Sequence, residues 1–273
     1  MYRFVVPIGA ALALTMVALG AACTSQGTSD ASESAPLTEG DIVDEDAVAI
    51  VRAAAHLLRD ADSLQVITRI GFDVVQDNGQ KIEFGEARVV ALQRPDRARF
   101  EYSRRDGKQG LVVFDGDDIW VYSQEQNVYA HTAQPGDIDA SIEFLIETLG
   151  ITTPLEDLFT ADVGSRLAEG LRSCYIVGDA TISGTPCDHV AASNDYADYQ
   201  MWIAKGDRPL VQRIVITYRM EPGQPQFWAE FNDWSVGTAL DAGLFVFQPP
   251  EGSERIFFEG TRALAAPLQP ERE

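Results

Sequence analysis

Two cysteines and a histidine are the residues of this chain whose types and spacing come nearest to reaction chemistry. Cys187 and His189 stand two positions apart, so in a strand they share one face, and a thiol beside an imidazole is the arrangement of a cysteine nucleophile. No third group that would orient the histidine is evident. We therefore favour a disulfide between Cys187 and Cys174, across a turn that contains glycine and proline, with two free thiols as the alternative.

The histidines and carboxylates do not form a recognisable metal site. His56, His131 and His189 fall on different predicted elements, and no His-x-x-x-His, His-Glu-x-x-His or Cys-x-x-Cys spacing occurs. The run from Asp115 to Asp118 is superficially like a calcium loop but lacks the later ligands and the closing glutamate, so we interpret it as a tight turn. We expect no metal and no cofactor.

Motifs of common enzyme classes are also absent from the sequence. It contains no Gly-x-Ser-x-Gly elbow, P-loop or dinucleotide fingerprint, and nothing singles out two carboxylates as a glycosidase pair. We expect a protein that is not an enzyme and keep a hydrolase as the least favoured alternative. The formal net charge of −21 excludes a nucleic-acid surface, which needs basic residues to displace counterions.

Aromatic and leucine side chains are the remaining candidates for a binding site. Placed between a sheet and the helices packed on it, they would line an apolar pocket, and the alternative is that they are ordinary core. The candidate lining residues are Phe72, Trp120, Tyr122, Phe144, Leu145, Leu149, Leu158, Phe159, Tyr199 and Trp202.

The elements that would position these residues follow from hydrophobic periodicity. Helical spacing from Ala47 to Ala61 predicts an amphipathic helix, and alternation from Leu64 to Val74 predicts a strand that ends in a hairpin at Asp77-Asn78-Gly79. Further strands of an antiparallel meander are predicted over residues 80–93, 97–104, 111–114, 119–123 and 128–131.

Two helices are predicted next, followed by a second meander. Residues 138–149 form an amphipathic helix ended by Gly150, and Thr153 and Pro154 begin a short second helix. Later strands are predicted from about residue 171 through both cysteines, and over residues 198–204, 210–218, 226–234 and 244–247. This order predicts an α+β fold over residues 41–260, in one domain.

The first 23 residues predict an exported protein. A short apolar run follows Arg3, and Leu19-Gly-Ala-Ala-Cys23 resembles the lipobox of bacterial lipoproteins, except that Gly20 stands where leucine is usual. We expect a lipidated Cys23, with a plain cleaved signal peptide as the alternative, and this leaves two cysteines for the disulfide. Residues 24–40 are small and polar and predict a flexible tether, and residues 261–273 a frayed tail.

Several short motifs, in order from about residue 45 to about 258, resemble a bacterial family of predicted periplasmic proteins of unknown function. They are Gly71-Phe-Asp-Val-Val75, Asp77-Asn-Gly-Gln-Lys81, Arg94-Pro-Asp-Arg97, Phe114-Asp-Gly-Asp-Asp-Ile-Trp-Val-Tyr122, Pro135-Gly-Asp-Ile-Asp139, Leu149-Gly150, Pro154-Leu-Glu-Asp-Leu158, Cys187-Asp-His189, Tyr199-Gln-Met-Trp-Ile203 and Phe245-Val-Phe-Gln-Pro-Pro250.

That family is similar in fold to the LolA and LolB lipoprotein carriers and receptors, to RseB and to mycobacterial lipid-binding lipoproteins. The resemblance implies a strongly curved, antiparallel, unclosed half-barrel with helices against its concave face and an apolar pocket for acyl chains. It implies a periplasmic protein that binds a lipid or a lipoprotein's acyl group, and Thr24 after the cysteine implies anchoring in the outer membrane. The alternative is an envelope protein-interaction or sensor module that uses the same scaffold.

Overall fold

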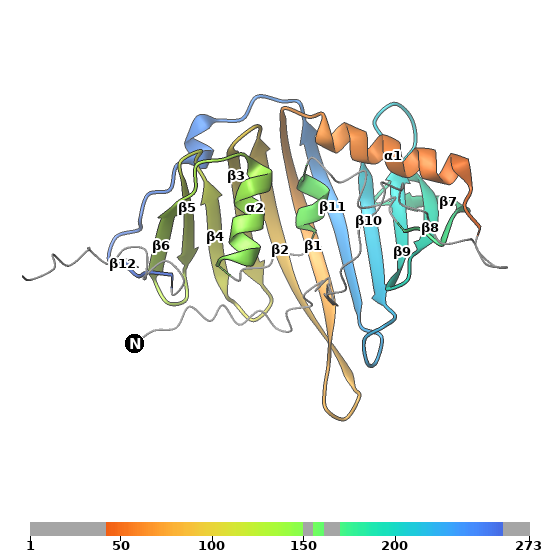
Figure 1. The fold of residues 1–273 in the computed structure, drawn as a ribbon, viewed down its shortest axis with the longest axis horizontal. Coiled ribbons are helices and arrows are strands. Elements are labelled where there is room, and N and C mark those ends of the chain that lie inside the picture. The colour runs from red at the N-terminus through yellow and green to blue at the C-terminus, as the bar shows by residue number, and fades with distance from the viewer. Residues whose placement is uncertain (1–41, 150–154, 161–169, 259–273) are drawn as a thin grey trace, which may run out of the picture.

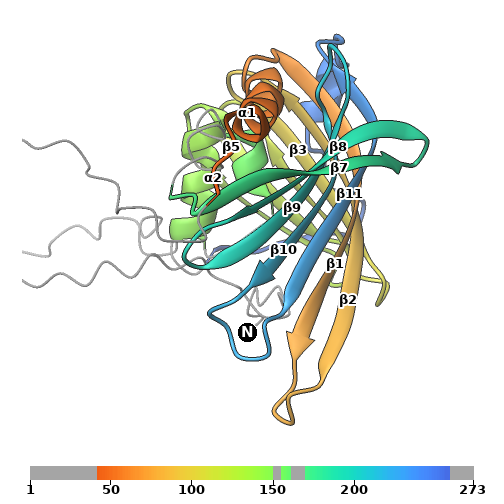
Figure 2. The same ribbon diagram turned by 90° about the vertical axis from the view of Figure 1, so that its right-hand side faces the viewer.

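A computed structural model describes residues 42–149, 155–160 and 170–258. Within them, twelve strands form one curved sheet that does not close into a barrel (Figures 1 and 2). The strand order is β12-β6-β5-β4-β3-β2-β1-β11-β10-β9-β8-β7, so β12 and β7 are the two edges. The predicted signal segment with Cys23, the tether, the tail and the helix-terminal residues Gly150, Thr153 and Pro154 lie outside the described residues.

The helices and strands follow the predicted order closely. The first half contains α1 (Glu45–Arg59), β1 (Ser63–Val75), β2 (Lys81–Gln93), β3 (Arg97–Arg104), β4 (Gln109–Phe114), β5 (Asp118–Ser123), β6 (Val128–Ala133), α2 (Ile138–Glu147) and the 3-10 helix η1 (Glu156–Phe159). The second half contains β7 (Ser173–Ile182), β8 (Thr185–Ser193), β9 (Ala197–Ala204), β10 (Val211–Tyr218), β11 (Gln226–Val236), the 3-10 helix η2 (Ala242–Phe245) and β12 (Glu254–Arg255).

The two predicted meanders join along one seam. The strands β1 to β6 pair in sequence order, and so do β7 to β11, while β1 also pairs antiparallel with β11. The hairpin predicted at Asp77-Asn78-Gly79 is confirmed: β1 and β2 pair over their full length, and Gly79 takes the positive φ that the turn needs. This long hairpin extends past the helices (Figure 1).

Both α-helices begin at aspartate caps and bury one face against the sheet. Asp44 Oδ1 accepts a hydrogen bond from a first-turn amide of α1, and Asp137 does the same for α2. The residues Val51, Leu58 and Leu145 are buried in one hydrophobic cluster with the strands. Neither described helix is long and apolar enough to cross a membrane.

The final part of the chain differs from the prediction. Residues 244–247 are not a strand, because Asp241 Oδ1 accepts a hydrogen bond of 2.7 Å from the amide of Gly243 and caps the 3-10 helix η2. The short strand β12 follows and pairs parallel with β6, so the sheet is antiparallel except at this edge. The apolar pattern of residues 244–247 reflects burial of Phe245 rather than strand alternation.

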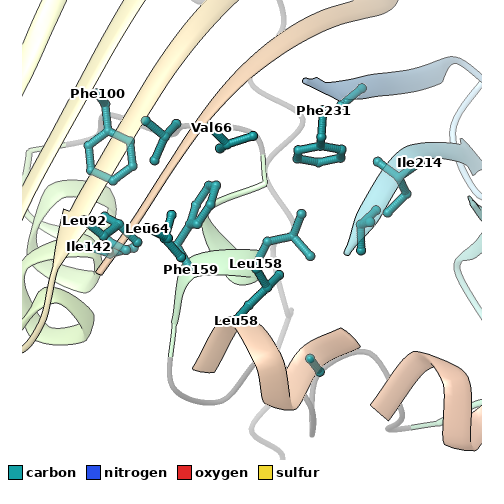
Figure 3. Packing of buried hydrophobic residues seen from close by; sticks show 14 of the residues in the cluster. Leu58, Leu64, Val66, Leu92, Phe100, Ile142, Leu158, Phe159, Ile214 and Phe231 are labelled. Atoms are coloured by element: carbon teal, nitrogen blue, oxygen red, sulfur yellow. The ribbon is translucent and has the colours of Figure 1, made fainter. Parts of the chain in front are cut away.

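The two faces of the sheet have different roles. The inner face, as we call it, carries alternate residues such as Leu64, Val66 and Ile70 of β1, which belong to the core, and the outer face carries the residues between them. Figure 1 shows α2, the short green helix η1 and α1 side by side over the sheet. Figure 3 shows the η1 residues Leu158 and Phe159 between α1 and the strands.

Candidate functional site

Seven of the ten candidate lining residues lie on the core side of the sheet. Leu145, Leu158 and Phe159 are buried in the hydrophobic cluster. The other four are partly buried and pack against it: Phe72, Phe144, Leu149 and Tyr199. The structure therefore places residues of β1, α2, η1 and β9, and Leu149 just after α2, in or against one hydrophobic cluster, and their role in lining a pocket stays a prediction.

Trp120 and Tyr122 are placed on the outer face, contrary to the prediction. Their neighbours Ile119 and Val121 occupy the inner face of β5 and are buried in the core. The indole of Trp120 stacks on the imidazole of His131, with ring centroids 4.1 Å apart, and Phe247 covers both Trp120 and Tyr122. Because β5 is apolar on both faces, its pattern could not show which set points inward.

Trp202 is also on the outer face. Its neighbours Met201 and Ile203 are in the core, while Trp202 stacks on His189 at 4.3 Å between ring centroids. His189 Nε2 lies 3.2 Å from Gln200 Oε1, so its polar partner comes from the neighbouring strand β9. These stacked rings hold neighbouring strands together and do not line the pocket.

The predicted disulfide is wrong, because Cys174 and Cys187 are both buried free thiols. In the β7–β8 hairpin Cys187 lies opposite Ala180, whereas Cys174 lies opposite Ala192, five residues farther along β8. At strand spacing this separates the cysteines by about 17 Å, far beyond the reach of a disulfide. The chain turns at residues 183–184, so a short sequence gap does not place the two cysteines opposite each other.

The two thiols are also poorly suited to nucleophilic chemistry. Burial is the main cause that raises the pKa of both Cys174 and Cys187, which keeps them protonated. Cys187 Sγ donates to the carbonyl of Thr185 at 3.3 Å. Among the described residues, no cluster of three or more histidine, cysteine and acidic side chains is placed to hold a metal ion.

A small cavity lies in the core beside η1. It has a volume of about 10 Å³, which is room for one water-sized group. Its apolar wall consists of Ile70, Val90, Phe100, Leu155 and Phe159. The rings of Phe100 and Phe159 meet edge to face beside it, with centroids 6.4 Å apart.

The cavity also has a polar wall, which sequence reasoning missed. It is formed by Thr68 of β1 and Arg88 of β2, which are direct partners across the two strands. Arg88 Nε donates to Glu86 Oε1, and both side chains are largely buried on the inner face. The signal in the sequence was a polar residue at an inner-face position. Thr68 interrupts the apolar alternation of β1, and Glu86 and Arg88 interrupt that of β2.

Tyr102 of β3 lies directly opposite Arg88 of β2 in the pairing of these two strands. Burial is the main cause that raises the pKa of its phenol, and the negative charge of Glu86 acts in the same direction. The phenol is therefore neutral at physiological pH. Glu86, Arg88 and Tyr102 place a hydrogen-bonding group of side chains on β2 and β3, next to the apolar core.

An apolar strip leads from this cavity to the free end of the β1–β2 hairpin. We define the open-end strip as the inner-face residues Phe72 and Val74 of β1 and Ile82 and Phe84 of β2. Phe72 stacks on Phe84 with ring centroids 6.1 Å apart, while Ile82 and Phe84 are both exposed. The strip therefore continues the core beyond the part of the sheet that the described helices cover.

The end of η1 is tied to the sheet next to the cavity. Arg94, just after β2, donates a hydrogen bond of 2.9 Å from Nη2 to the carbonyl oxygen of Phe159. This contact holds the main chain of η1 while its side chains Leu158 and Phe159 are buried. The segment is thus packed as part of the core.

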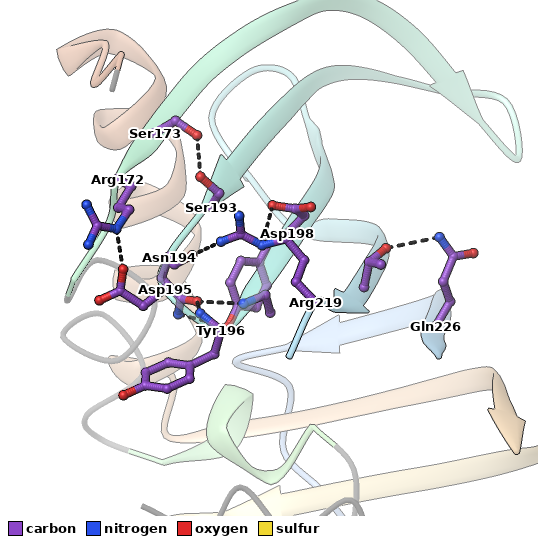
Figure 4. Close-up of polar contacts among 12 residues, drawn as sticks. Arg172, Ser173, Ser193, Asn194, Asp195, Tyr196, Asp198, Arg219 and Gln226 are labelled. Atoms are coloured by element: carbon purple, nitrogen blue, oxygen red, sulfur yellow. Dashed lines mark hydrogen bonds and ion pairs between the residues drawn. The ribbon is translucent and has the colours of Figure 1, made fainter. Parts of the chain in front are cut away.

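Polar contacts at the β8–β9 turn fix Tyr199, and Figure 4 shows Asn194, Asp198 and Arg219 in this network. Asn194 Nδ2 donates to the Tyr199 hydroxyl at 3.2 Å, and the Asn194 carbonyl accepts from Arg219. Arg219 also forms an ion pair of 3.1 Å with Asp198. The turn positions the Tyr199 ring against the core, and its hydroxyl is already engaged.

These features define a curved, unclosed β-sheet protein whose apolar inner face is packed with helices. The family described as "Predicted periplasmic protein (DUF2092)" matches residues 47–259, and the chain belongs to that family. No protein of curated function matches the chain significantly.

Several solved structures are similar in fold. The lipoprotein LppX from Mycobacterium tuberculosis is 15% identical, with 73% of this chain and 99% of that one covered and a TM-score of 0.46. LprF from Mycobacterium bovis is 12% identical, with 78% and 99% covered and a TM-score of 0.46. A LolA superfamily protein from Nitrosomonas europaea is 13% identical, with 74% and 97% covered and a TM-score of 0.36. Likeness at this level gives no basis for assigning a ligand.

Proposed function

We propose that this protein is a non-catalytic cell-envelope protein that binds the acyl chain of a lipid or lipoprotein on the inner face of its half-barrel. In this proposal the helices cover the concave side of one domain, residues 41–260, and the open-end strip is where the ligand first makes contact. The family's description as periplasmic is consistent with this location.

The open-end strip is the observation that carries the proposal. Soluble proteins seldom leave stacked aromatic and aliphatic side chains exposed without a binding role. Here Phe84 is 39% exposed and continuous, through Phe72, with the buried core. An acyl chain laid on this strip would remove its apolar surface from water, at roughly 25 cal/mol for each Å² buried.

The filled core restricts how a ligand can bind. The cavity of about 10 Å³ beside η1 does not have room for an acyl chain. The proposal therefore places the chain along the open-end strip and not inside the packed core around Leu158 and Phe159.

The proposal also includes an anchor. Lipidation of Cys23 and the polar segment 24–40 would hold the domain some 20 to 25 Å from the outer membrane, at roughly 5 to 6 Å times the square root of the tether length. Labelling of cells with a radioactive fatty acid tests this point. Label should enter the wild type and be lost in Cys23→Ser, and an unlabelled wild type contradicts the anchor.

A pair of variants with matched exposure tests acyl binding. Phe84→Glu places a charge on the open-end strip, and Ile67→Glu places one on the outer face of β1, where Ile67 is 38% exposed. The purified full chain should bind laurate, measured by calorimetry and native mass spectrometry. Binding should be lost in Phe84→Glu and retained in Ile67→Glu. Absence of binding in the wild type, or equal binding in all three proteins, refutes the proposal.

The edge strand β7 supports a second candidate function, recognition of an envelope protein. Tyr175, Ile176 and Val177 are consecutive exposed apolar residues on β7. At this edge Val43 forms a single parallel bridge with Cys174, and no described strand pairs with the residues that follow Cys174. An exposed apolar edge favours addition of an extended segment from a partner protein as a further strand. Envelope crosslinking should then recover a protein partner that Val177→Glu removes and Phe84→Glu leaves unchanged. Recovery of the same partner with Val177→Glu contradicts this candidate.

A further inference from the structure

Thr68 carries a buried hydroxyl that has no hydrogen-bond partner among the described residues. Thr68 is 2% exposed, at the centre of β1, and the residue lines the cavity beside η1. Val66 and Ile70, the inner-face neighbours of Thr68 on the same strand, are fully buried core residues. Buried hydroxyls are nearly always hydrogen-bonded, so an unpaired hydroxyl on a residue that lines a cavity indicates an oxygen or nitrogen atom supplied from outside the protein.

The cavity suits the polar end of a ligand better than its chain. Its volume of about 10 Å³ holds one oxygen-sized group. The opposite position across the strands is Arg88, a residue that also lines the cavity and whose Nε donates a hydrogen bond to Glu86. The wall thus presents a hydroxyl donor and a cation side by side, which together suit a carbonyl or carboxylate oxygen.

The polar wall and the open-end strip are successive parts of the same two strands. From the pair Thr68 and Arg88, the next inner-face pairs are Ile70 with Glu86, then Phe72 with Phe84, then Val74 with Ile82. These pairs extend about 20 Å toward the hairpin tip at strand spacing. A linear amphiphile with one oxygen-bearing end matches this order, with its head at Thr68 and its chain on the strip.

We propose that Thr68 and Arg88 bind the carbonyl oxygen of an acyl group whose hydrocarbon chain lies along the open-end strip. This inference rests on the proposed function and adds to it the ligand's chemistry and orientation. A free fatty acid and an acyl ester share the oxygen that Thr68 recognises, and they differ in charge. An alkane has the chain but lacks the oxygen.

The test compares three probes on the purified full chain: laurate, methyl laurate and dodecane. Thr68→Val removes the hydroxyl with little change of shape, and Thr68→Ser keeps the hydroxyl. Because Thr68→Val loses one hydrogen bond to the ligand, its affinity for laurate and for methyl laurate should be about three- to tenfold lower than that of the wild type. Thr68→Ser should bind both like the wild type, and dodecane should bind the three proteins equally. Stronger binding of laurate than methyl laurate in the wild type identifies a free acid, and equal binding identifies an ester.

The ligand-free proteins give an independent readout. Thr68→Val should melt at a higher temperature than the wild type, because it removes an unpaired buried hydroxyl. A lower melting temperature shows that the hydroxyl is already satisfied, for example by a trapped water, and overturns the inference.

The inference and the proposed function fail in different ways. In one outcome, Thr68→Val binds laurate and methyl laurate as tightly as the wild type while Phe84→Glu still loses binding. That result overturns the role of Thr68 and leaves acyl binding on the open-end strip intact. Absence of binding of all three probes to the wild type removes both.

Discussion

Phe159 offers a sharp test of whether side chains fill the space under the helices. It is 3% exposed, meets Phe100 edge to face and forms part of the cavity wall. Truncation of a buried phenylalanine to alanine costs about 3–5 kcal/mol, through lost burial and the cavity left behind. Phe159→Ala should therefore destabilise the protein by about that amount.

The magnitude translates into readily measured shifts. For a domain of this size, 1 kcal/mol corresponds to about 2–4 °C in melting temperature, so Phe159→Ala should melt about 6–20 °C below the wild type. Urea unfolding followed by tryptophan fluorescence gives the free energy of unfolding directly. Tyr196→Ala is the matched control, because Tyr196 is 71% exposed, and its free energy of unfolding should change by less than about 0.5 kcal/mol.

A loss below about 1 kcal/mol in Phe159→Ala would refute this account of the core. It would mean that Phe159 lies in an open space and that truncation removes little packing. The acyl chain would then have room under the helices, and its placement along the open-end strip would have to be abandoned.

Three further predictions follow from other parts of the structure. When the protein is unfolded in the absence of reductant, Cys174 and Cys187 should both react with iodoacetamide. In the folded protein they should react only slowly up to about pH 8.5, because burial raises the pKa of both thiols. Two unreactive cysteines in the unfolded chain would indicate a disulfide. Asp44→Ala should lower the free energy of unfolding by about 0.5–2 kcal/mol in urea titrations, because it removes the cap of α1, and an unchanged midpoint would contradict that role. Gly71→Ala should cost about 1–3 kcal/mol in the same assay, because a Cβ would lie 2.4 Å from the indole of Trp228; full stability would show that this ring moves aside freely.

The sequence located most elements because local signals agree with the final fold. Alternation marked β1, an Asn-Gly turn marked the first hairpin, and amphipathic spacing marked α2. The strand predicted over residues 244–247 failed because a short apolar run does not distinguish a strand from a buried 3-10 helix.

The candidate site depended more on contacts between distant residues. Phe72, Leu158 and Phe159 were found because their apolar character suits the core, whereas Trp120, Tyr122 and Trp202 were assigned to the wrong face. Alternation shows which residues of a strand share a face. It does not show which face is covered by helices when both carry apolar side chains.

The sequence by itself determined the order of elements, the resemblance to the family and the acidic net charge. Only the tertiary structure decided that β1 pairs with β11, that Cys174 and Cys187 lie far apart and that Thr68 lies beside Arg88 in the wall of a cavity. These three facts depend on strand register and on pairing between residues far apart in the chain. Periodicity within one strand carries no information about either.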